Sequence, residues 1–335
     1  MRHRKLVAAA AFLLPVSVSA QVIDLTANNT GVAIGDKPVV NGVRINFRDR
    51  HLERVNGVDI TVWTPYEPAT GAVNGVAIGL PATGAADITG IGAGIVGVGA
   101  SRSFHGIGVA GVGLGAGGDM VGIMLGGIGV GGGGSVTGIS IGGIGVGAGG
   151  SLKGIQIGGI GVGGAADMTG ISIGGIGAGG GGNIKGLAIG GVGVGGGGSL
   201  TGIGIGGIGV GSGGNVTGIS VGGIGVGAGG TLTGLAIGGV GVGAPEIHGV
   251  AIGGFGVGGE RVHAIALSIA YFKIAEHGRF DGGALAAVND VRGAQHGLTI
   301  GLWNYAHELH GAQVGLINIS DNGGSRRILP LISVR

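Results

Sequence analysis

A sixteen-residue repeat runs through most of this chain of 335 residues. From Gly90 to Gly234 the same unit restarts every sixteen residues, and the copy at 138–153 reads Gly-Ile-Ser-Ile-Gly-Gly-Ile-Gly-Val-Gly-Ala-Gly-Gly-Ser-Leu-Lys. A unit this short cannot bury its own apolar side chains, so neighbouring copies have to stack on one another. The repeat therefore predicts a stacked array, and it says more about architecture than about chemistry.

Glycine accounts for 93 residues, a share that is typical of collagen-like or disordered chains. Only seven prolines are present and glycine has no three-residue period, which excludes a collagen triple helix. Disordered segments lack β-branched residues, whereas Ile and Val recur here at fixed places in every unit. Helix is also disfavoured, because each glycine costs about 1 kcal/mol relative to alanine.

Apolar residues occupy positions 2, 4, 7, 9 and 15 of the unit, counted from its first glycine, and a small residue occupies position 11. Positions 2 and 4 alternate as in a strand, and so do positions 7 and 9, but the phase changes at the Gly-Gly pair between them. A glycine bend at that pair would let all five apolar positions point inward. The same three-residue step separates position 15 from position 2 of the next unit, so each unit is predicted to be two or three short strands joined by glycine corners. An Ile-to-Gly change at position 2 or 4 should then cost more stability than a change at position 3.

The predicted fold is therefore all-β, a β-solenoid of about eighteen short coils with mostly sixteen residues each. Shorter units, starting at Gly283, Gly297 and Gly311, close the array. The predicted segments are a signal peptide (1–20), an N-terminal cap (21–41), irregular first coils (42–89), the regular solenoid (90–263), C-terminal coils (264–324) and a C-terminal cap (325–335).

The first twenty residues have the layout of a secretory signal peptide. Arg2, Arg4 and Lys5 precede an apolar stretch, and small residues lead up to Ala20. Without the leader, fifteen Lys and Arg face sixteen Asp and Glu, so the remaining chain is nearly neutral and gives no reason to expect a nucleic-acid partner. The chain has no cysteine, so we expect an exported protein without disulfides, located at the cell surface, at the outer membrane or outside the cell.

Two outward rows of small polar residues are expected at positions 14 and 16, on either side of an inward residue at position 15. Regular rows of this kind can order water, which makes an ice-binding solenoid a minor alternative function. The alternative explanation is that Ser, Asn and Asp at position 14 form side-chain turns with the backbone. Lys153 and Lys185 interrupt the row at position 16, whose threonines are Thr137, Thr169, Thr201, Thr217 and Thr233.

Four histidines are the only weak candidates for metal ligands. His248 and His263 each precede a coil start, and so do His296 and His310, which predicts two pairs of neighbouring imidazoles. Neighbouring imidazoles can bind Zn²⁺ or Cu²⁺, but the same spacing also describes a solvated column of polar residues. The sequence does not predict a metal site.

No catalytic constellation stands out. The chain has no thiol, its acidic residues are scattered, and no Gly-x-Gly segment opens a helix after a strand as nucleotide binding requires. We therefore expect no enzyme activity and no cofactor.

The C-terminal units carry a family resemblance. Residues 297–304 read Gly-Leu-Thr-Ile-Gly-Leu-Trp-Asn, residues 311–318 read Gly-Ala-Gln-Val-Gly-Leu-Ile-Asn, and a Leu-Pro-Leu-Ile ending follows. This phrase resembles the uncharacterised bacterial surface-repeat proteins over residues 283–335. The resemblance implies an exported repeat protein at the cell surface and brings no catalytic residues. The central Gly-Ile array departs from that pattern.

The leading functional hypothesis is an exported, non-enzymatic rod that acts as a structural or binding element at the cell surface or envelope. Few bulky outward side chains are expected over residues 122–248, so flat rows of Gly and Ala could pack against another copy or against an envelope or extracellular polymer. The alternative is an outer-membrane β-barrel with one strand per unit. Strand alternation lasts only about four residues and aromatic residues are scarce, so membrane insertion is not favoured.

Overall fold

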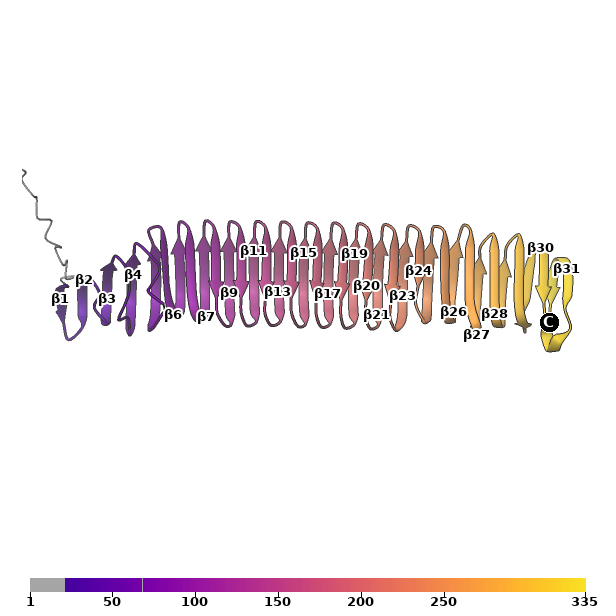
Figure 1. Cartoon of the computed structure of the whole chain (residues 1–335), viewed down its shortest axis with the longest axis horizontal. Coiled ribbons are helices and arrows are strands. Elements are labelled where there is room, and N and C mark those ends of the chain that lie inside the picture. Colours follow the sequence, from indigo (N-terminus) through magenta and orange to yellow (C-terminus); the bar gives the residue numbers. More distant parts are fainter. Residues whose placement is uncertain (1–21, 68) are drawn as a thin grey trace, which may run out of the picture.

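Each sixteen-residue unit forms one coil made of a long strand and a short strand. In one such coil β11 (Val136–Gly142) is followed by β12 (Gly145–Ala148), and the glycine-rich corners lie between them and after β12. The computed structural model describes residues 22–67 and 69–335. It stacks about eighteen coils into a straight rod (Figure 1). The sequence left open a β-solenoid and a β-barrel, and the structure is a β-solenoid.

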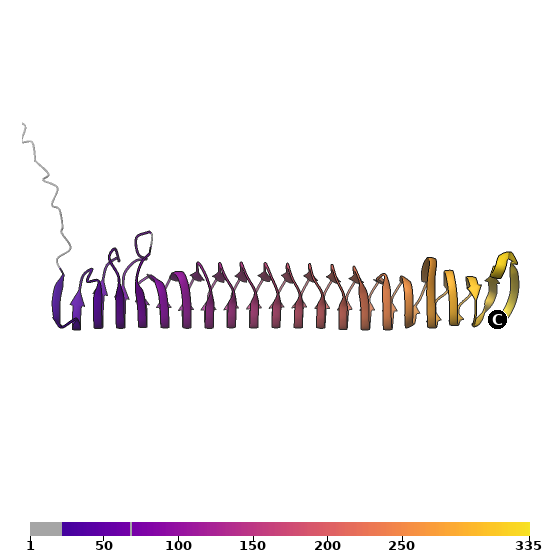
Figure 2. The ribbon, with the colours of Figure 1, turned by 90° about the horizontal axis from the view of Figure 1, so that it is seen from below.

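The long strands form the first sheet of the rod and the short strands form the second sheet (Figure 2). The first sheet contains β3 (Val39–Asn46), β4 (Arg54–Thr61), β5 (Ala72–Gly79), β9 (Met120–Gly126), β11, β13 (Leu152–Gly158), β15 (Met168–Gly174), β17 (Ile184–Gly190), β19 (Leu200–Gly206), β21 (Val216–Gly222), β23 (Thr231–Gly238) and β25 (Glu246–Gly253). The second contains β8 (Gly113–Ala116), β10 (Gly129–Gly132), β12, β14 (Gly161–Gly164), β16 (Gly177–Gly180), β18 (Gly193–Gly196), β20 (Gly209–Ser212), β22 (Gly225–Ala228), β24 (Gly241–Gly243) and β29 (Trp303–Leu309). Strands that contribute to both sheets are β6 (Ala82–Gly94), β7 (Gly97–Ala110), β26 (Gly256–Ser268), β27 (Tyr271–Leu285), β28 (Val288–Ile300) and β30 (Ala312–Ser320).

Successive coils pair in parallel and in register. Ile139 lies beside Ile155, and Val146 lies beside Val162, so each position of the unit becomes a straight column along the rod. The corners are also hydrogen-bonded from coil to coil, as where Ile160 N donates to Ile144 O over 2.7 Å. Near the C-terminus Gly282 rather than Gly283 aligns with Gly297, so the predicted start of that unit was one residue late.

The interior is formed by positions 3, 5, 9 and 15 of the unit. Val136 at position 15, Ser140 at position 3 and Val146 at position 9 are all buried. By contrast, Ile141 at position 4 is 39% exposed and Ile144 at position 7 is 49% exposed. The assignment of positions 9 and 15 to the core is confirmed, and the assignment of positions 2, 4 and 7 to the core was wrong.

The phase of the long strand explains this inversion. A Cβ atom on Gly142, at position 5, would lie 2.1 Å from the carbonyl oxygen of Gly145 across the corner of the same coil, so position 5 points inward and has no room for a side chain. Position 3 is Ser, Ala or Gly in most regular coils, although Met124 and Gln156 are also buried there, and the alternating residues at positions 2 and 4 face outward. Because position 3 is inside and positions 2 and 4 are outside, we now expect substitutions at position 3 to cost more stability than substitutions at positions 2 and 4.

The glycine at position 1 lies within the long strand and not at a corner. Gly138 has a φ of 117°, and a Cβ atom there would lie 2.0 Å from the carbonyl oxygen of Gly122 in the preceding coil. Only glycine combines this backbone conformation with such close stacking. The long strand therefore runs unbroken from position 15 to position 5, which puts positions 15, 3 and 5 on one side of the sheet.

Antiparallel hairpins close both ends of the rod. At the N-terminus β1 (Ile23–Ala27) pairs with β2 (Thr30–Ile34), which already stacks in parallel on β3. At the C-terminus a 3-10 turn, η1 (Asn322–Gly324), leads into β31 (Arg327–Val334), which pairs with β30. The predicted signal peptide lies outside the described residues.

A buried ionic network occupies the position-3 column of the first coils, beside apolar residues such as Val40. Nε of Arg44 donates to Asp59 over 2.8 Å, and Nη2 of the same side chain contacts Asp49. One guanidinium thus serves two carboxylates. Burial raises the pKa of Asp49 to about 6, because the opposing effect of Arg44 is weaker than the loss of hydration. Oδ1 of Asp49 accepts from Asn46 as well, while Oδ2 lacks a hydrogen-bond partner and is free to carry the proton.

We expect Leu200→Ala, in the core, to lower the free energy of unfolding by about 2–4 kcal/mol, whereas Ile203→Ala, on the outer side of the same strand, should cost less than about 1 kcal/mol. Chemical denaturation followed by circular dichroism measures both. A larger loss for Ile203→Ala would contradict the interior described above.

The raised pKa of Asp49 predicts a pH dependence of local stability. The folded state holds its proton more tightly than the unfolded state, so the stability of the first coils should fall as pH rises from about 4 to about 6, by at most about 1.4 kcal/mol per pH unit. Asp49→Asn should remove this loss and protect the amides of β3 and β4 at pH 8, measured by hydrogen exchange corrected for intrinsic rates.

Asp24→Asn is a control of opposite sign, because hydrogen bonding to Lys37 lowers the pKa of Asp24. That variant should gain no protection at pH 8. Equal protection of these amides at pH 8 in the two variants would contradict the raised pKa of Asp49.

Candidate functional site

The outer side of the first sheet carries two continuous apolar columns. The position-4 column runs from Ile34 to Val314, and every residue in it is Ile, Val, Leu or Ala. The position-2 column runs beside it from Val32 to Ile265 and is interrupted at Gly283. We call these two columns the apolar face. The expectation of few bulky outward side chains over residues 122–248 was therefore wrong.

A third apolar column occupies the corner at position 7, between the two sheets. Its members are about half exposed from Val96 to Val240, and Phe255 extends it. On the far side of this corner the second sheet has glycine at positions 8 and 10, so its outer side is bare backbone. At Gly131 and Gly211 an added Cβ atom would meet no other atom within 4 Å. The predicted glycine rows are therefore found on the second sheet only.

The predicted threonine row forms one polar column beside the apolar face. Thr137, Thr169, Thr201, Thr217 and Thr233 align at position 16, with Lys153 and Lys185 between them as the sequence indicated. The position-14 side chains are engaged instead with the next coil. Oδ1 of Asp167, for example, accepts from the backbone N–H of Asn183 over 2.7 Å. These residues tie coils together and do not form a second free row.

The histidines continue the same position-16 column. His248 lies beside Thr233, and its ring stacks on that of His263 at 5.2 Å. His296 and His310 stack at 4.9 Å, so the predicted pairs are adjacent. Ring nitrogens point along the ring plane, so stacked imidazoles do not aim their lone pairs at one ion. Among residues 22–67 and 69–335, no group of three or more His, Cys, Asp or Glu residues could hold a metal ion.

Sequence reasoning missed Asp281 in this column. It lies between the two histidine pairs, with Oδ2 at 3.1 Å from Nδ1 of His263 and Oδ1 at 3.8 Å from Nδ1 of His296. Arg279 lowers the pKa of Asp281, with the two histidines contributing less. The sequence contains the pattern that places Asp281 in this column, because Asp281 directly precedes the coil-start glycine at 282. Starting that coil at Gly283 shifted the residue out of the column.

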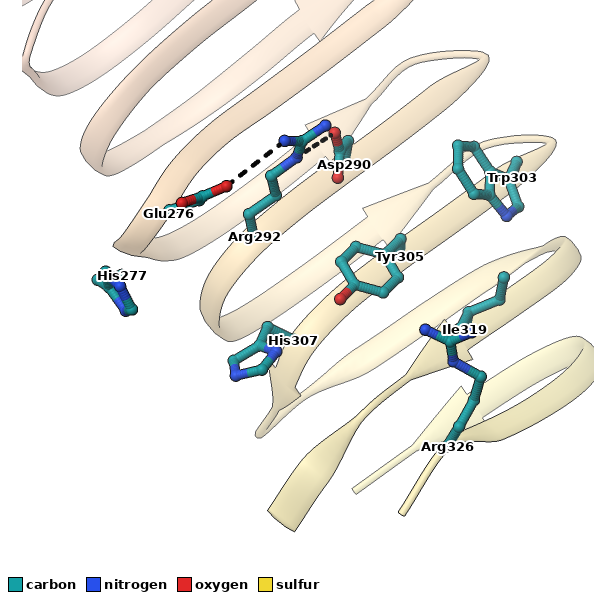
Figure 3. Close-up of a pocket in the computed structure, with 9 residues that line it drawn as sticks. All are labelled: Glu276, His277, Asp290, Arg292, Trp303, Tyr305, His307, Ile319 and Arg326. Atoms are coloured by element: carbon teal, nitrogen blue, oxygen red, sulfur yellow. Dashed lines mark hydrogen bonds and ion pairs between the residues drawn. The ribbon is translucent and has the colours of Figure 1, made fainter. Parts of the chain in front are cut away.

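A cleft of about 540 Å³ interrupts the regular surface near the C-terminus. It lies where the glycine columns of the second sheet end, because Gly256 and Gly258 are followed in register by Tyr271 and Lys273. Residues 275–278 bulge out of β27, where they lie opposite only two residues of β28, and they raise one wall, where His277 has a φ of 60°. The cleft is lined by Glu276, His277, Asp290, Arg292, Trp303, Tyr305, His307, Ile319 and Arg326 (Figure 3).

Two similar hydrogen-bonded groups surround this cleft. The hydroxyl of Tyr271 donates to Oδ2 of Asp290 over 2.9 Å, and Nε of Arg292 donates to the same oxygen over 3.0 Å. Two coils further on, the hydroxyl of Tyr305 donates to Asp321 over 2.9 Å.

Arg326 completes the second group, because its Nε donates to Asp321 over 2.8 Å. Burial raises the pKa of Tyr271 and of Tyr305, and their hydrogen bonds to carboxylates act in the same direction. Both phenols therefore stay protonated and keep donating at neutral pH.

Comparison with known proteins adds no assignment: no family model, no curated protein and no solved structure matches this chain. Within the described part of the chain, no helix is long and apolar enough to span a membrane. Function therefore has to be argued from the surface itself.

Arg326 holds the pKa of Asp321 below its usual value, so Arg326→Gln should raise that pKa. Because the folded pKa is the lower one, the stability that Asp321 contributes is present above pH 3.8 and is lost as pH falls through the folded pKa. Carboxyl-carbon NMR titration measures the shift. Arg327→Gln, next to it in β31, is the matched control and should leave Asp321 unchanged. If the Asp321 carboxyl titrates identically in the two variants, the pairing of Arg326 with Asp321 is contradicted.

Proposed function

We propose that this chain is an exported, non-enzymatic structural rod whose copies associate side by side through the apolar face. The observation that carries the proposal is the outward exposure of the position-2 and position-4 columns. Ile139 is 37% exposed and Ile141 is 39% exposed, and neighbouring coils repeat this pattern along the rod. Export is supported by the leader layout of residues 1–20.

The size of the apolar face supports association. About eighteen coils at the strand spacing give a face roughly 85 Å long, and two columns of side chains make it about 10 Å wide. That area is on the order of 800 Å², which is larger than the apolar patches typical of monomers and similar to what each partner contributes to a stable interface.

The shape and charge of this face suit a second copy of the same rod. From Gly106 to Gly249 the coils pair without a register shift, so the columns are straight and two faces can match along their length. Between residues 122 and 233 the only charged residues in the flanking position-16 column are Lys153 and Lys185. Two such faces would stack about 10 Å apart, as sheets do in β-sandwiches.

Lysine on the apolar face should disperse the assembly. We expect the chain without residues 1–20 to sediment as dimers or larger species, and Ile139→Lys combined with Ile219→Lys to sediment as monomers with an unchanged circular dichroism spectrum. Burying two ammonium groups in an apolar interface would cost several kcal/mol, so they keep the faces apart.

Gly131→Lys combined with Gly211→Lys is the matched control, because it adds the same charge to neighbouring coils on the opposite, glycine side, where space is open. This control should still associate. Monomeric behaviour of the unmodified chain, or dispersal by the glycine-side substitutions alone, would refute association through the apolar face.

A further inference from the structure

The C-terminal cleft differs from the rest of the rod in chemistry as well as in shape. Along the outer side of the second sheet, the position-8 and position-10 columns contain only glycine from Gly97 to Gly258. At the cleft the same columns become Tyr271, Val288 and Trp303, and Lys273, Asp290 and Tyr305. Bulky aromatic and charged groups are thus gathered at one end of an otherwise bare face.

The charges of the cleft are balanced in pairs. Arg292 faces Asp290 at 3.0 Å and Glu276 at 3.8 Å (Figure 3). Arg326 faces Asp321 at 2.8 Å. A phosphate or carboxylate would lie beside carboxylates that already neutralise each arginine. The cleft therefore offers no surplus positive charge for an anionic ligand.

The same pairs leave donors and acceptors available. Among the described residues, Arg292 makes a hydrogen bond only through Nε, so its two terminal amino groups can donate to a ligand. Asp290 accepts only at Oδ2, which leaves Oδ1 as an acceptor. A guanidinium beside a carboxylate that a tyrosine holds in place matches a pair of adjacent hydroxyl groups, because each hydroxyl can donate to the carboxylate and accept from the guanidinium.

Aromatic rings complete the arrangement. Trp303 is 40% exposed, and Figure 3 places it and Tyr305 on the same cleft as Arg292. An exposed ring beside fixed polar groups suits a ligand with one apolar C–H face and an edge of hydroxyl groups. Sugar rings have both features, and the volume of about 540 Å³ is in the range of small-molecule sites.

We propose that this cleft is a binding site for an uncharged saccharide, with a sugar ring against Trp303 and its hydroxyl groups on Arg292 and Asp290. The site is on the second sheet, whereas the apolar face is on the first. Saccharide binding and lateral association can therefore fail independently of each other.

The chain's own tryptophans allow a direct test. Only Trp63 and Trp303 are present, so Trp63→Phe leaves Trp303 as the sole tryptophan reporter in the cleft. We would titrate this variant with cellotriose, maltotriose and chitotriose, and with inorganic phosphate as the anionic probe. At least one trisaccharide should change the Trp303 fluorescence saturably, and phosphate should not.

Single substitutions in the chain that keeps Trp63 show where the trisaccharide binds, with affinity measured by calorimetry. Trp303→Leu and Arg292→Gln should each weaken the trisaccharide by at least about tenfold, whereas Phe255→Ala, an exposed aromatic on the corner outside the cleft, should bind normally. Circular dichroism confirms that each variant is folded. The proposal is overturned if no trisaccharide binds, if phosphate binds equally well, or if Phe255→Ala is as damaging as the cleft variants.

Discussion

The tight corner between the two strands of each coil, together with the phase of the long strand, determines most of what this molecule presents to its surroundings. At position 5, beside this corner, a single added carbon on Gly142 would collide with the carbonyl oxygen of Gly145. The interior holds an apolar side chain at position 15, a medium one at position 9 and mostly small ones at position 3, with Met124 and Gln156 as larger exceptions. Because side chains alternate along the strand, the isoleucines at positions 2 and 4 are on the outside.

This constraint links the fold to the proposed function. A long strand of the opposite phase would bury the residues at positions 2 and 4. Here, the phase of the long strand leaves an apolar face that no part of the described chain covers, and straight stacking extends it along the rod. Such a face is stable in water when a matching surface covers it, and another copy of the same rod has the same repeat distance.

The sequence predicted the solenoid, its coil length and its polar column because those follow from the period alone. It did not predict which residues are inside, because that depends on where the strand is broken. The three-residue step from position 15 to position 2 was interpreted as a corner, although Gly138 lies within a continuous strand. Position 15 is Val, Leu, Ile, Met or Phe in every regular coil and position 5 is almost always glycine, and this pair of facts indicates the correct phase.

The cleft could not be predicted for a different reason. Its residues come from β27, β28, β29, β30 and the segment before β31, and residues 275–278, which bulge from β27, raise one of its walls. Spacing in the sequence does not show that Tyr271 pairs with Asp290, or Tyr305 with Asp321. In the regular coils the sixteen-residue period is enough to predict which residues lie side by side. In the irregular C-terminal coils it is not, and only the three-dimensional structure identifies the cleft.

The central claim is that the isoleucines of the long strands face outward, and cysteine accessibility tests it most directly. The chain has no cysteine of its own, so Ser140→Cys and Ile141→Cys each place one thiol at neighbouring residues of β11. In dilute, monomeric protein, a thiol reagent should label Ile141→Cys rapidly and Ser140→Cys only after unfolding. Rapid labelling of Ser140→Cys together with protection of Ile141→Cys would show that the isoleucines form the core and would contradict the account.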